Sequence, residues 1–199
     1  MKLDILAIVA HPDDETIWMG GTILKNKKWD WTVISLCRCH DDDRRPRFEK
    51  VCERLGVKGV ISDLDDVKLK PLRVDAVVEK IKSLLLDREY DYVYTHGLNG
   101  EYGHIRHKEI HKAVRRLVKS GEIQCKKLFS FSYKQGRGRA GNVPDLRIPV
   151  PSDKSDVHVR LSEDNFKKKV ELVKDMYGFG GDSFEVMACN SVEAFKELV

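Results

Sequence analysis

The feature that most constrains the fold is the alternation of short, β-rich apolar runs with segments whose apolar residues recur at helical spacing. Residues 3–10 are almost continuously apolar, as expected for a strand that is buried on both faces. Such alternation predicts an α/β fold with a mostly parallel central sheet and helices on both faces. The expected strands lie at about 3–10, 31–36, 60–61, 92–95, 128–133 and 157–161, and the expected helices at about 16–25, 48–55, 74–85, 110–118 and 166–177.

One internal segment lacks any periodicity. Between residues 136 and 156 Gly, Pro, Ser and Asp accumulate, which predicts a long loop of the kind that often covers a site. The basic side chains near its start have two readings, a contact with an anionic part of a substrate or exposed loop charge; these are Lys134, Arg137 and Arg139. His158 follows the loop, and the sequence leaves its role open. The lysines at 167–169 are interpreted as the solvated face of the last helix.

Composition sets the broad class of the protein. Its 199 residues suit a single domain, 1–199, and 36 Lys and Arg against 32 Asp and Glu give a formal net charge of only +4. This balance argues against a nucleic-acid partner, and no apolar run is long enough to predict a transmembrane segment. Five cysteines without paired spacing favour a reducing compartment, so we expect a cytoplasmic protein. The Cys37-x-Cys39-His40 segment has no second cysteine pair and is interpreted as the end of a strand.

Two loops carry most of the residues capable of chemistry. The segment 11–15 (His-Pro-Asp-Asp-Glu) directly follows the first predicted strand, and the segment 96–111 follows the strand that ends at Thr95. Ligands of open α/β sheets bind beyond the carboxyl ends of the strands, so we expect these two polar segments to converge in space.

The residue types in these loops predict a metal site. Imidazole nitrogens and carboxylate oxygens are the usual zinc donors outside cysteine-rich sites, and a catalytic zinc takes three protein ligands. His11, Asp14 and one histidine of the second loop supply such a set, which leaves Asp13 to take a proton from an attacking water. The alternative is a polar turn with an aspartate at the helix N-terminus.

Helical spacing ranks the later histidines. His107 lies within the apolar stripe of the helix around 110–118 and is predicted to be the third ligand. His104 lies just before the helix and is predicted to stabilise an oxyanion or to protonate a leaving amine. His111 lies at the margin of the stripe, where it is a reserve ligand or a partly buried helix residue.

Several motifs resemble those of a known family. The segment 10–15 (Ala-His-Pro-Asp-Asp-Glu) resembles the signature of the zinc-dependent de-N-acetylases of the PIG-L, or LmbE-like, family. The segment 103–107 (Gly-His-Ile-Arg-His) resembles the family's second signature, a His-x-x-His pair. Gly20-Gly21 and the segment 55–57 (Leu-Gly-Val) also fit the family pattern, in the expected order.

The resemblance implies a Rossmann-like fold and a role for each motif residue. It implies zinc ligation by His11, Asp14 and His107, with Fe²⁺ or Co²⁺ as further metals that such a donor set can hold. It implies that Asp13 is the general base and that His104 assists the oxyanion or the leaving group.

Two segments depart from the family pattern. Ile105 and Arg106 replace the common Pro-Asp between the paired histidines. Arg44 matches the family's arginine near the substrate, but Arg47 stands where the family has an acidic residue.

The resemblance implies hydrolysis of an N-acetyl group on an N-acetylglucosamine-like amino sugar or a related small molecule, by a protein that can form a homo-oligomer. One alternative is a non-catalytic module that binds metal and sugar. Another is a nucleotide-binding transferase of Rossmann-like fold, although the first strand leads into His-Pro-Asp-Asp rather than a glycine-rich phosphate loop.

Overall fold

The computed structural model describes residues 2–199. Its strands are β1 (Asp4–Val9), β2 (Asp30–Ser35), β3 (Lys58–Ile61), β4 (Glu89–Thr95), β5 (Gln124–Phe131), β6 (Tyr133–Arg139), β7 (Arg147–Pro151), β8 (Val157–Arg160) and β9 (Val192–Glu197). Its helices are α1 (Asp14–Lys25), α2 (Arg44–Leu55), α3 (Val74–Leu84), α4 (Ile105–Lys119), α5 (Glu163–Glu171) and α6 (Phe184–Met187), and α5 continues into a π-helical turn, η1 (Leu172–Met176).

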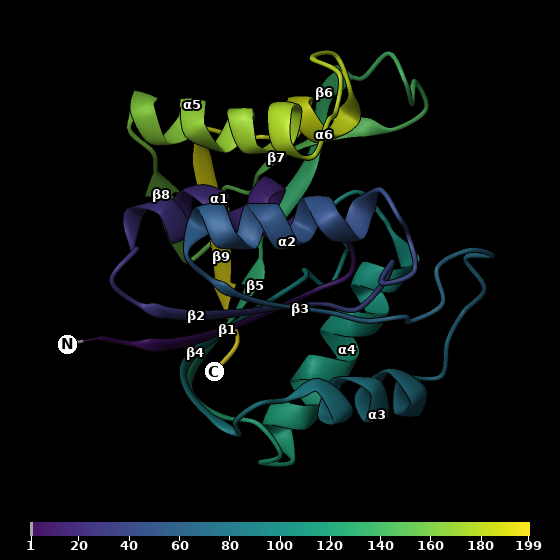
Figure 1. The fold of residues 1–199 in the computed structure, drawn as a ribbon, viewed down its shortest axis with the longest axis vertical. Coiled ribbons are helices and arrows are strands. Elements are labelled where there is room, and N and C mark those ends of the chain that lie inside the picture. The colour runs from purple at the N-terminus through teal and green to yellow at the C-terminus, as the bar shows by residue number, and fades with distance from the viewer. Residues whose placement is uncertain (1) are drawn as a thin grey trace.

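The central sheet of the described chain has seven strands in the order β3-β2-β1-β4-β5-β9-β8. β1 pairs in parallel with β2 and β4, β2 with β3, and β4 with β5, whereas β9 is antiparallel to both of its neighbours. Helices α1, α2 and α5 cover one face of the sheet, and α3 and α4 cover the other (Figure 1). The predicted three-layer, mostly parallel α/β fold is therefore confirmed.

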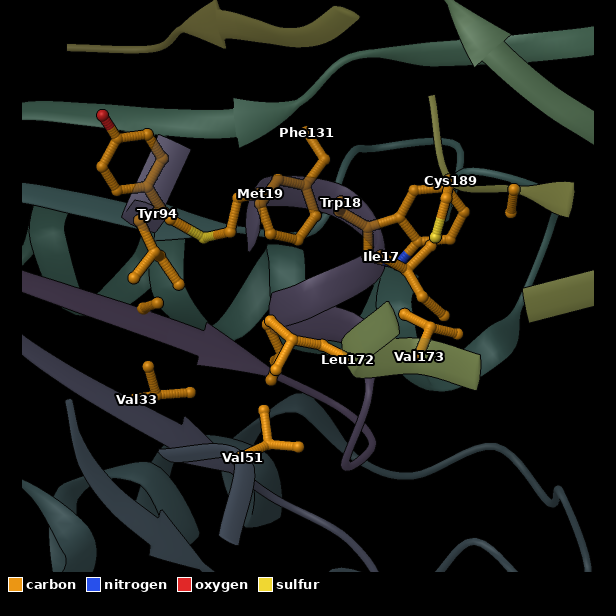
Figure 2. Packing of buried hydrophobic residues seen from close by; sticks show 14 of the residues in the cluster. Ile17, Trp18, Met19, Val33, Val51, Tyr94, Phe131, Leu172, Val173 and Cys189 are labelled. Carbon is orange, nitrogen blue, oxygen red and sulfur yellow. The ribbon is translucent and has the colours of Figure 1, made fainter. Parts of the chain in front are cut away.

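A separate hydrophobic core lies on each face of the sheet. On the first face, Trp18 and Met19 of α1 pack among Phe131 of β5 and Leu172 and Val173 of η1 (Figure 2). On the second face, alternate residues of β1 contact α3 and α4; they belong to a cluster that contains Leu6, Ile8, Val77 and Ile110. Because β1 faces a core on both sides, nearly all of its side chains must be apolar, which explains the continuous run in the sequence.

The long loop predicted for 136–156 is wrong in part. β6 and β7 form a second, two-stranded antiparallel sheet, in which Tyr133 lies opposite Pro151. The sequence of β6 shows no apolar face because most of its side chains are exposed, so its extended backbone depends on hydrogen bonds with β7. The strand β9 was also not predicted; it lies between β5 and β8 and joins the C-terminal segment to the sheet.

The solvated lysine face predicted for 167–169 is wrong for Lys169. This side chain is fully buried, and its Nζ lies 2.7 Å from Oε1 of Glu193 in β9. The same carboxylate accepts hydrogen bonds from the backbone N–H groups of Gly21 and Thr22 in α1. A Cβ at Gly21 would lie 2.3 Å from a methyl group of Leu161, so glycine permits this close approach of α1 to the C-terminal segment.

Candidate metal centre

The two polar loops meet where the strand order reverses. β1 and β4 are neighbours, and from them the chain builds the sheet outward in opposite directions through β2 and β5. This is the topological switch point at which open α/β sheets bind their ligands. The segment after β1 carries His11, Asp13 and Asp14, and the segment after β4 leads to His104 and His107 at the start of α4.

Three of the predicted ligand residues bring one donor atom each to a common point. Nδ1 of His11 lies 3.2 Å from Oδ2 of Asp14, and Nε2 of His107 lies 3.4 Å from each of these two atoms. Donor atoms bound to one tetrahedral zinc at 2.0–2.2 Å lie about 3.3–3.6 Å apart. The triangle therefore matches one face of the coordination tetrahedron of a single small divalent ion. His107 is fully buried and Asp14 nearly so, whereas His11 is partly exposed.

Hydrogen bonds orient both histidines of the triangle. Nδ1 of His107 lies 2.5 Å from Oε2 of the fully buried Glu101, and Nε2 of His11 lies 3.1 Å from Oδ2 of Asp66. A carboxylate can only accept, so each contacted nitrogen carries a proton, and the opposite ring nitrogen is the one that faces the triangle and becomes a metal donor once it is deprotonated. Such carboxylate–histidine pairs are typical of the outer contacts of metal sites.

A further buried histidine lies beside the triangle. Nε2 of His96 is 3.5 Å from Oδ2 of Asp14, but it accepts the backbone N–H of Ala10 at 2.9 Å. Nδ1 of His96 lies 2.9 Å from Glu101, and the His96 and His107 rings are stacked with centroids 3.7 Å apart. Because both of its nitrogens are engaged, His96 supports the loop and His107 rather than supplying a donor atom.

Asp13 is held in a strained backbone conformation beside the donor atoms. Its φ of 128° is rare for a residue with a side chain, and its carbonyl accepts hydrogen bonds from Thr16 and Ile17 in the first turn of α1. Burial and the neighbouring Asp14 raise the pKa of Asp13, while Arg44, whose Nη1 lies 3.1 Å from Oδ2, opposes this shift. A carboxyl with a raised pKa is suited to accept a proton near neutral pH.

The triangle opens into a polar cavity of about 210 Å³. Asp13, Arg44 and His104 line it together with the aromatic side chains of Trp18 and Tyr102. Its volume lies below the roughly 300–1,000 Å³ of sites for drug-sized ligands, which suits a small polar group.

His104 lies at the edge of the donor set. Its ring centroid is 4.8 Å from that of His11 and 4.7 Å from that of His107, so its imidazole also lies within reach of an ion in this cluster. Its buried Nδ1 has no hydrogen-bond partner among residues 2–199. Burial and the charges of His107 and His11 lower the pKa of His104 to about 3, which keeps it neutral.

The triangle holds protons when no metal is bound. Although burial opposes the charged form, hydrogen bonds to Asp14 and Asp66 raise the pKa of His11 to about 9. The Asp14 charge and hydrogen bonds to Asp14 and Glu101 likewise overcome burial and raise the pKa of His107 to about 10. A bound cation would replace these protons.

The two departures from the family pattern lie outside the cavity. Arg106 is fully buried, and it donates to the backbone carbonyl of Asp65 at 2.5 Å and to Glu109 at 2.7 Å. It therefore connects α4 to the loop that carries Asp66. Arg47 pairs with Asp43 at the first turn of α2 and does not line the cavity.

Other polar residues noted in the sequence lie away from the cavity. His111 is buried, does not line this cavity, and has its Nδ1 2.7 Å from the His96 carbonyl. His158 is exposed and contacts the Ser152 carbonyl. None of the basic residues at 134, 137 and 139 lines this cavity.

Sequence reasoning missed the residues that orient the ligands. Glu101 and His96 lie inside the polar segment already singled out, but Glu101 has a φ of 55° and its role depends on a turn that the sequence did not predict. Asp66 belongs to the loop after β3, far from both motifs in the chain. Trp18 was assigned only to a helix, yet its indole N–H donates to Oδ1 of Asp14, one helical turn away.

The fold and this cluster define a Rossmann-like α/β protein with a candidate mononuclear metal centre at its switch point. The PIG-L family model, described as GlcNAc-PI de-N-acetylase, matches residues 6–118 of the chain. The protein belongs to this family. The match covers the segments that carry both loops of the cluster and ends within α4.

One similar sequence is an uncharacterised protein of Acanthamoeba polyphaga mimivirus. The two are 30% identical over 152 residues, which cover 66% of this chain and 63% of that protein. The match thus spans less than two thirds of the relative's length.

Two solved structures share the fold at 15% sequence identity. A conserved protein of Thermus thermophilus superposes with a TM-score of 0.67, covering 99% of this chain and 95% of its own. A deacetylase triple mutant from the teicoplanin biosynthetic pathway superposes with a TM-score of 0.59, covering 87% and 81%. Among the helices of residues 2–199, we find none with the length and apolar character needed to cross a membrane.

Proposed function

We propose that the protein is a metal-dependent hydrolase that removes an N-acetyl group from an N-acetylglucosamine-like amino sugar or a related small molecule. The observation that carries this proposal is the triangle of donor atoms, with sides of 3.2 and 3.4 Å, beside the carboxylate of Asp13 in one cavity. Membership of the PIG-L family supports the same reaction.

His11, Asp14 and His107 would hold the metal, with Zn²⁺ as the first choice and Fe²⁺ or Co²⁺ as alternatives for this donor set. When bound, such an ion polarises a carbonyl oxygen and makes water more acidic. Glu101 and Asp66 keep the lone pairs of the two histidines pointed at the ion and are positioning residues. Arg44 restrains Asp13 through the 3.1 Å ion pair and covers the ring of Phe179.

The chain's own groups account for the proton transfers. Asp13 accepts a proton from the water whose oxygen attacks the acetamide carbon. His104, which is neutral, donates a hydrogen bond to the oxygen that becomes negatively charged in the tetrahedral intermediate. The proton held by Asp13 then passes to the nitrogen as the C–N bond breaks, and the products are acetate and the free amine. Arg44 would in addition contact a polar group of the sugar.

The first experiment measures metal content and amine release on the same purified protein. We expect about one tightly bound metal per chain, lost in His11→Ala and in Asp14→Ala, and release of amine from N-acetylated amino sugars only by the metal-loaded protein. His158→Ala is the matched control, because this histidine lies outside the cavity.

Two results would contradict the proposal. Absence of bound metal after reconstitution with Zn²⁺, Fe²⁺ or Co²⁺ would exclude the metal centre. A loaded protein that binds acetylated sugars with saturation but releases no amine would favour the binding module over the hydrolase.

A further inference from the structure

A second cavity, of about 350 Å³, is lined in part by the segment that follows β4. Its walls come from that segment, from α4, from the C-terminal ends of β5 and β9, and from Ser152, just after β7. It shares no lining residue with the cavity that contains Asp13 and His104. Its polar lining includes Asn99, His111, Arg115, Ser130, Ser132 and Lys196.

His111 lines this cavity and holds an unused hydrogen-bond acceptor. The residue is only 2% exposed, and its Nδ1 lies 2.7 Å from the backbone carbonyl of His96. A carbonyl only accepts, so Nδ1 carries the proton and Nε2 holds a lone pair. Nε2 is buried and has no partner among residues 2–199. Buried acceptors of this kind are almost always satisfied by water or by a ligand.

The groups around His111 are donors and cations. Arg115 lies one helical turn beyond His111 on α4 and makes no ion pair within residues 2–199, and Lys196 reaches the rim from β9 while contacting Asp156. Serine hydroxyls from the end of β5 add further donors. Burial and the Arg115 and Lys112 charges lower the pKa of His111, which keeps Nε2 an acceptor.

This combination selects a particular ligand chemistry. The cations and hydroxyls favour an anion, but the buried acceptor needs a ligand that also donates a hydrogen bond. A phosphate group that keeps a P–O–H meets both requirements, whereas sulfate is an acceptor only. Inorganic phosphate has a P–O–H near neutral pH, and a monoester keeps one below its second pKa of about 6. We propose that this second cavity binds a phosphate group, free or carried on a small molecule. In this proposal Arg115 pairs with the charged phosphate oxygens, and Nε2 of His111 accepts a hydrogen bond from the phosphate hydroxyl.

The cavity shares a wall with the loop that orients the metal ligands. Asn99 lines it, donates to the carbonyl of Tyr133 at 2.8 Å and accepts from the backbone N–H of Glu101 at 3.3 Å. Glu101 in turn orients His107. Occupation of the second cavity is therefore expected to stabilise the conformation of the loop that the metal centre uses.

The test is a titration of the full-length, chelator-treated protein with inorganic phosphate, with sulfate in parallel, followed by calorimetry and by ³¹P NMR line broadening. Removing the metal keeps phosphate from binding as a metal ligand. We expect saturable phosphate binding and at least about tenfold weaker sulfate binding. Arg115→Gln is expected to weaken phosphate binding at least about tenfold.

Arg116→Gln is the matched control, because the adjacent arginine loses the same charge but pairs with Asp75 outside the cavity. We expect it to leave phosphate binding within about twofold of the unmodified protein. His111→Phe is expected to abolish the preference for phosphate over sulfate, and a thermal melt reports whether that variant folds.

Three outcomes would overturn the proposal: no saturable phosphate binding, equal affinity for phosphate and sulfate, or equal losses in Arg115→Gln and Arg116→Gln. A titration near pH 6, where about half of a phosphate monoester keeps its P–O–H, separates the two sources of the ligand, since tighter binding of the monoester than of inorganic phosphate indicates a carried phosphate. These readouts do not use deacetylation, so the second cavity and the proposed activity can fail independently.

Discussion

Two clusters of buried charged residues lie against α1, and they differ in how their polar atoms are paired within the fold. Near the middle of the helix, the carboxylate of Glu193 accepts from Lys169, from the hydroxyl of Thr22 and from two backbone N–H groups. At the start of the helix, Nδ1 of His11, Oδ2 of Asp14 and Nε2 of His107 face one another at 3.2–3.4 Å.

The first cluster is closed, because every charge has its partner within the fold. The second is open, because its three donor atoms converge within 3.2–3.4 Å of one another, and beside them Oδ1 of Asp66 and Nδ1 of His104 have no partners within residues 2–199. Burial of charge is common to both clusters. Converging donor atoms beside unpartnered polar atoms distinguish the second cluster from the first.

The largest expected effect is the pH dependence of metal binding, which should separate the open cluster from the closed one. The raised pKa values of His11 and His107 mean that both are protonated below about pH 9 in the metal-free protein. Metal binding must release these protons, so affinity rises with pH, by up to about 10⁴-fold between pH 6.5 and 8.5. Competition with a chelator at fixed pH measures this, and a flat profile would show that the cluster is deprotonated already.

A substitution at Asp13 tests whether the open cluster performs chemistry. Asp13→Asn keeps the shape and the neighbours of the side chain but cannot take a proton. We expect turnover to fall about 10²–10⁴-fold while metal content stays near one per chain. Steady-state kinetics with elemental analysis distinguish this result from loss of metal. Unchanged turnover would remove Asp13 from the mechanism.

The closed cluster should affect stability alone. Lys169→Met leaves the Glu193 carboxylate buried without its cation, and we expect a loss of about 3–5 kcal/mol in the free energy of unfolding. The double variant Lys169→Met with Glu193→Gln should recover part of this loss, because the uncompensated charge is gone. Denaturant unfolding measures both. Metal affinity reduced by more than about tenfold in the folded single variant would show that the two clusters are coupled.

A smaller effect is expected at Glu101, which orients the open cluster without supplying a donor atom. Glu101→Gln keeps the size of the side chain but replaces the charged acceptor of the His107 Nδ1–H hydrogen bond with a neutral amide oxygen. We expect metal affinity to fall about 10–100-fold, the usual cost of losing such an outer contact. Glu109→Gln in α4 is the control, since Glu109 contacts Arg106 rather than a metal ligand. Equal losses in the two variants would mean that charge alone, not orientation, matters.

Much of the layout follows from local patterns in the sequence. The apolar run before His11 and the helical stripe around 110–118 predicted β1 and α4, and the polar residues at their ends include all three corners of the donor triangle. These features are local, since a centrally buried strand must be apolar and a ligand on a helix must share the face that meets the sheet. The β6–β7 pair, the strand β9 and the buried Lys169 were not predicted, because each depends on a partner distant in the chain.

The order of residues along the chain is enough to specify the alternating α/β plan, the two polar loops at the ends of β1 and β4, and the residue types capable of binding a metal. Which nitrogen of each histidine faces the metal position is a tertiary property, because it depends on carboxylates that arrive from other loops, Glu101 for His107 and Asp66 for His11. Tertiary contacts likewise engage both ring nitrogens of His96, and Nδ1 of His111, in hydrogen bonds outside the donor triangle. Periodicity specifies the face of an element, but hydrogen-bond partners that are distant in the chain specify which atom on that face is left free to react.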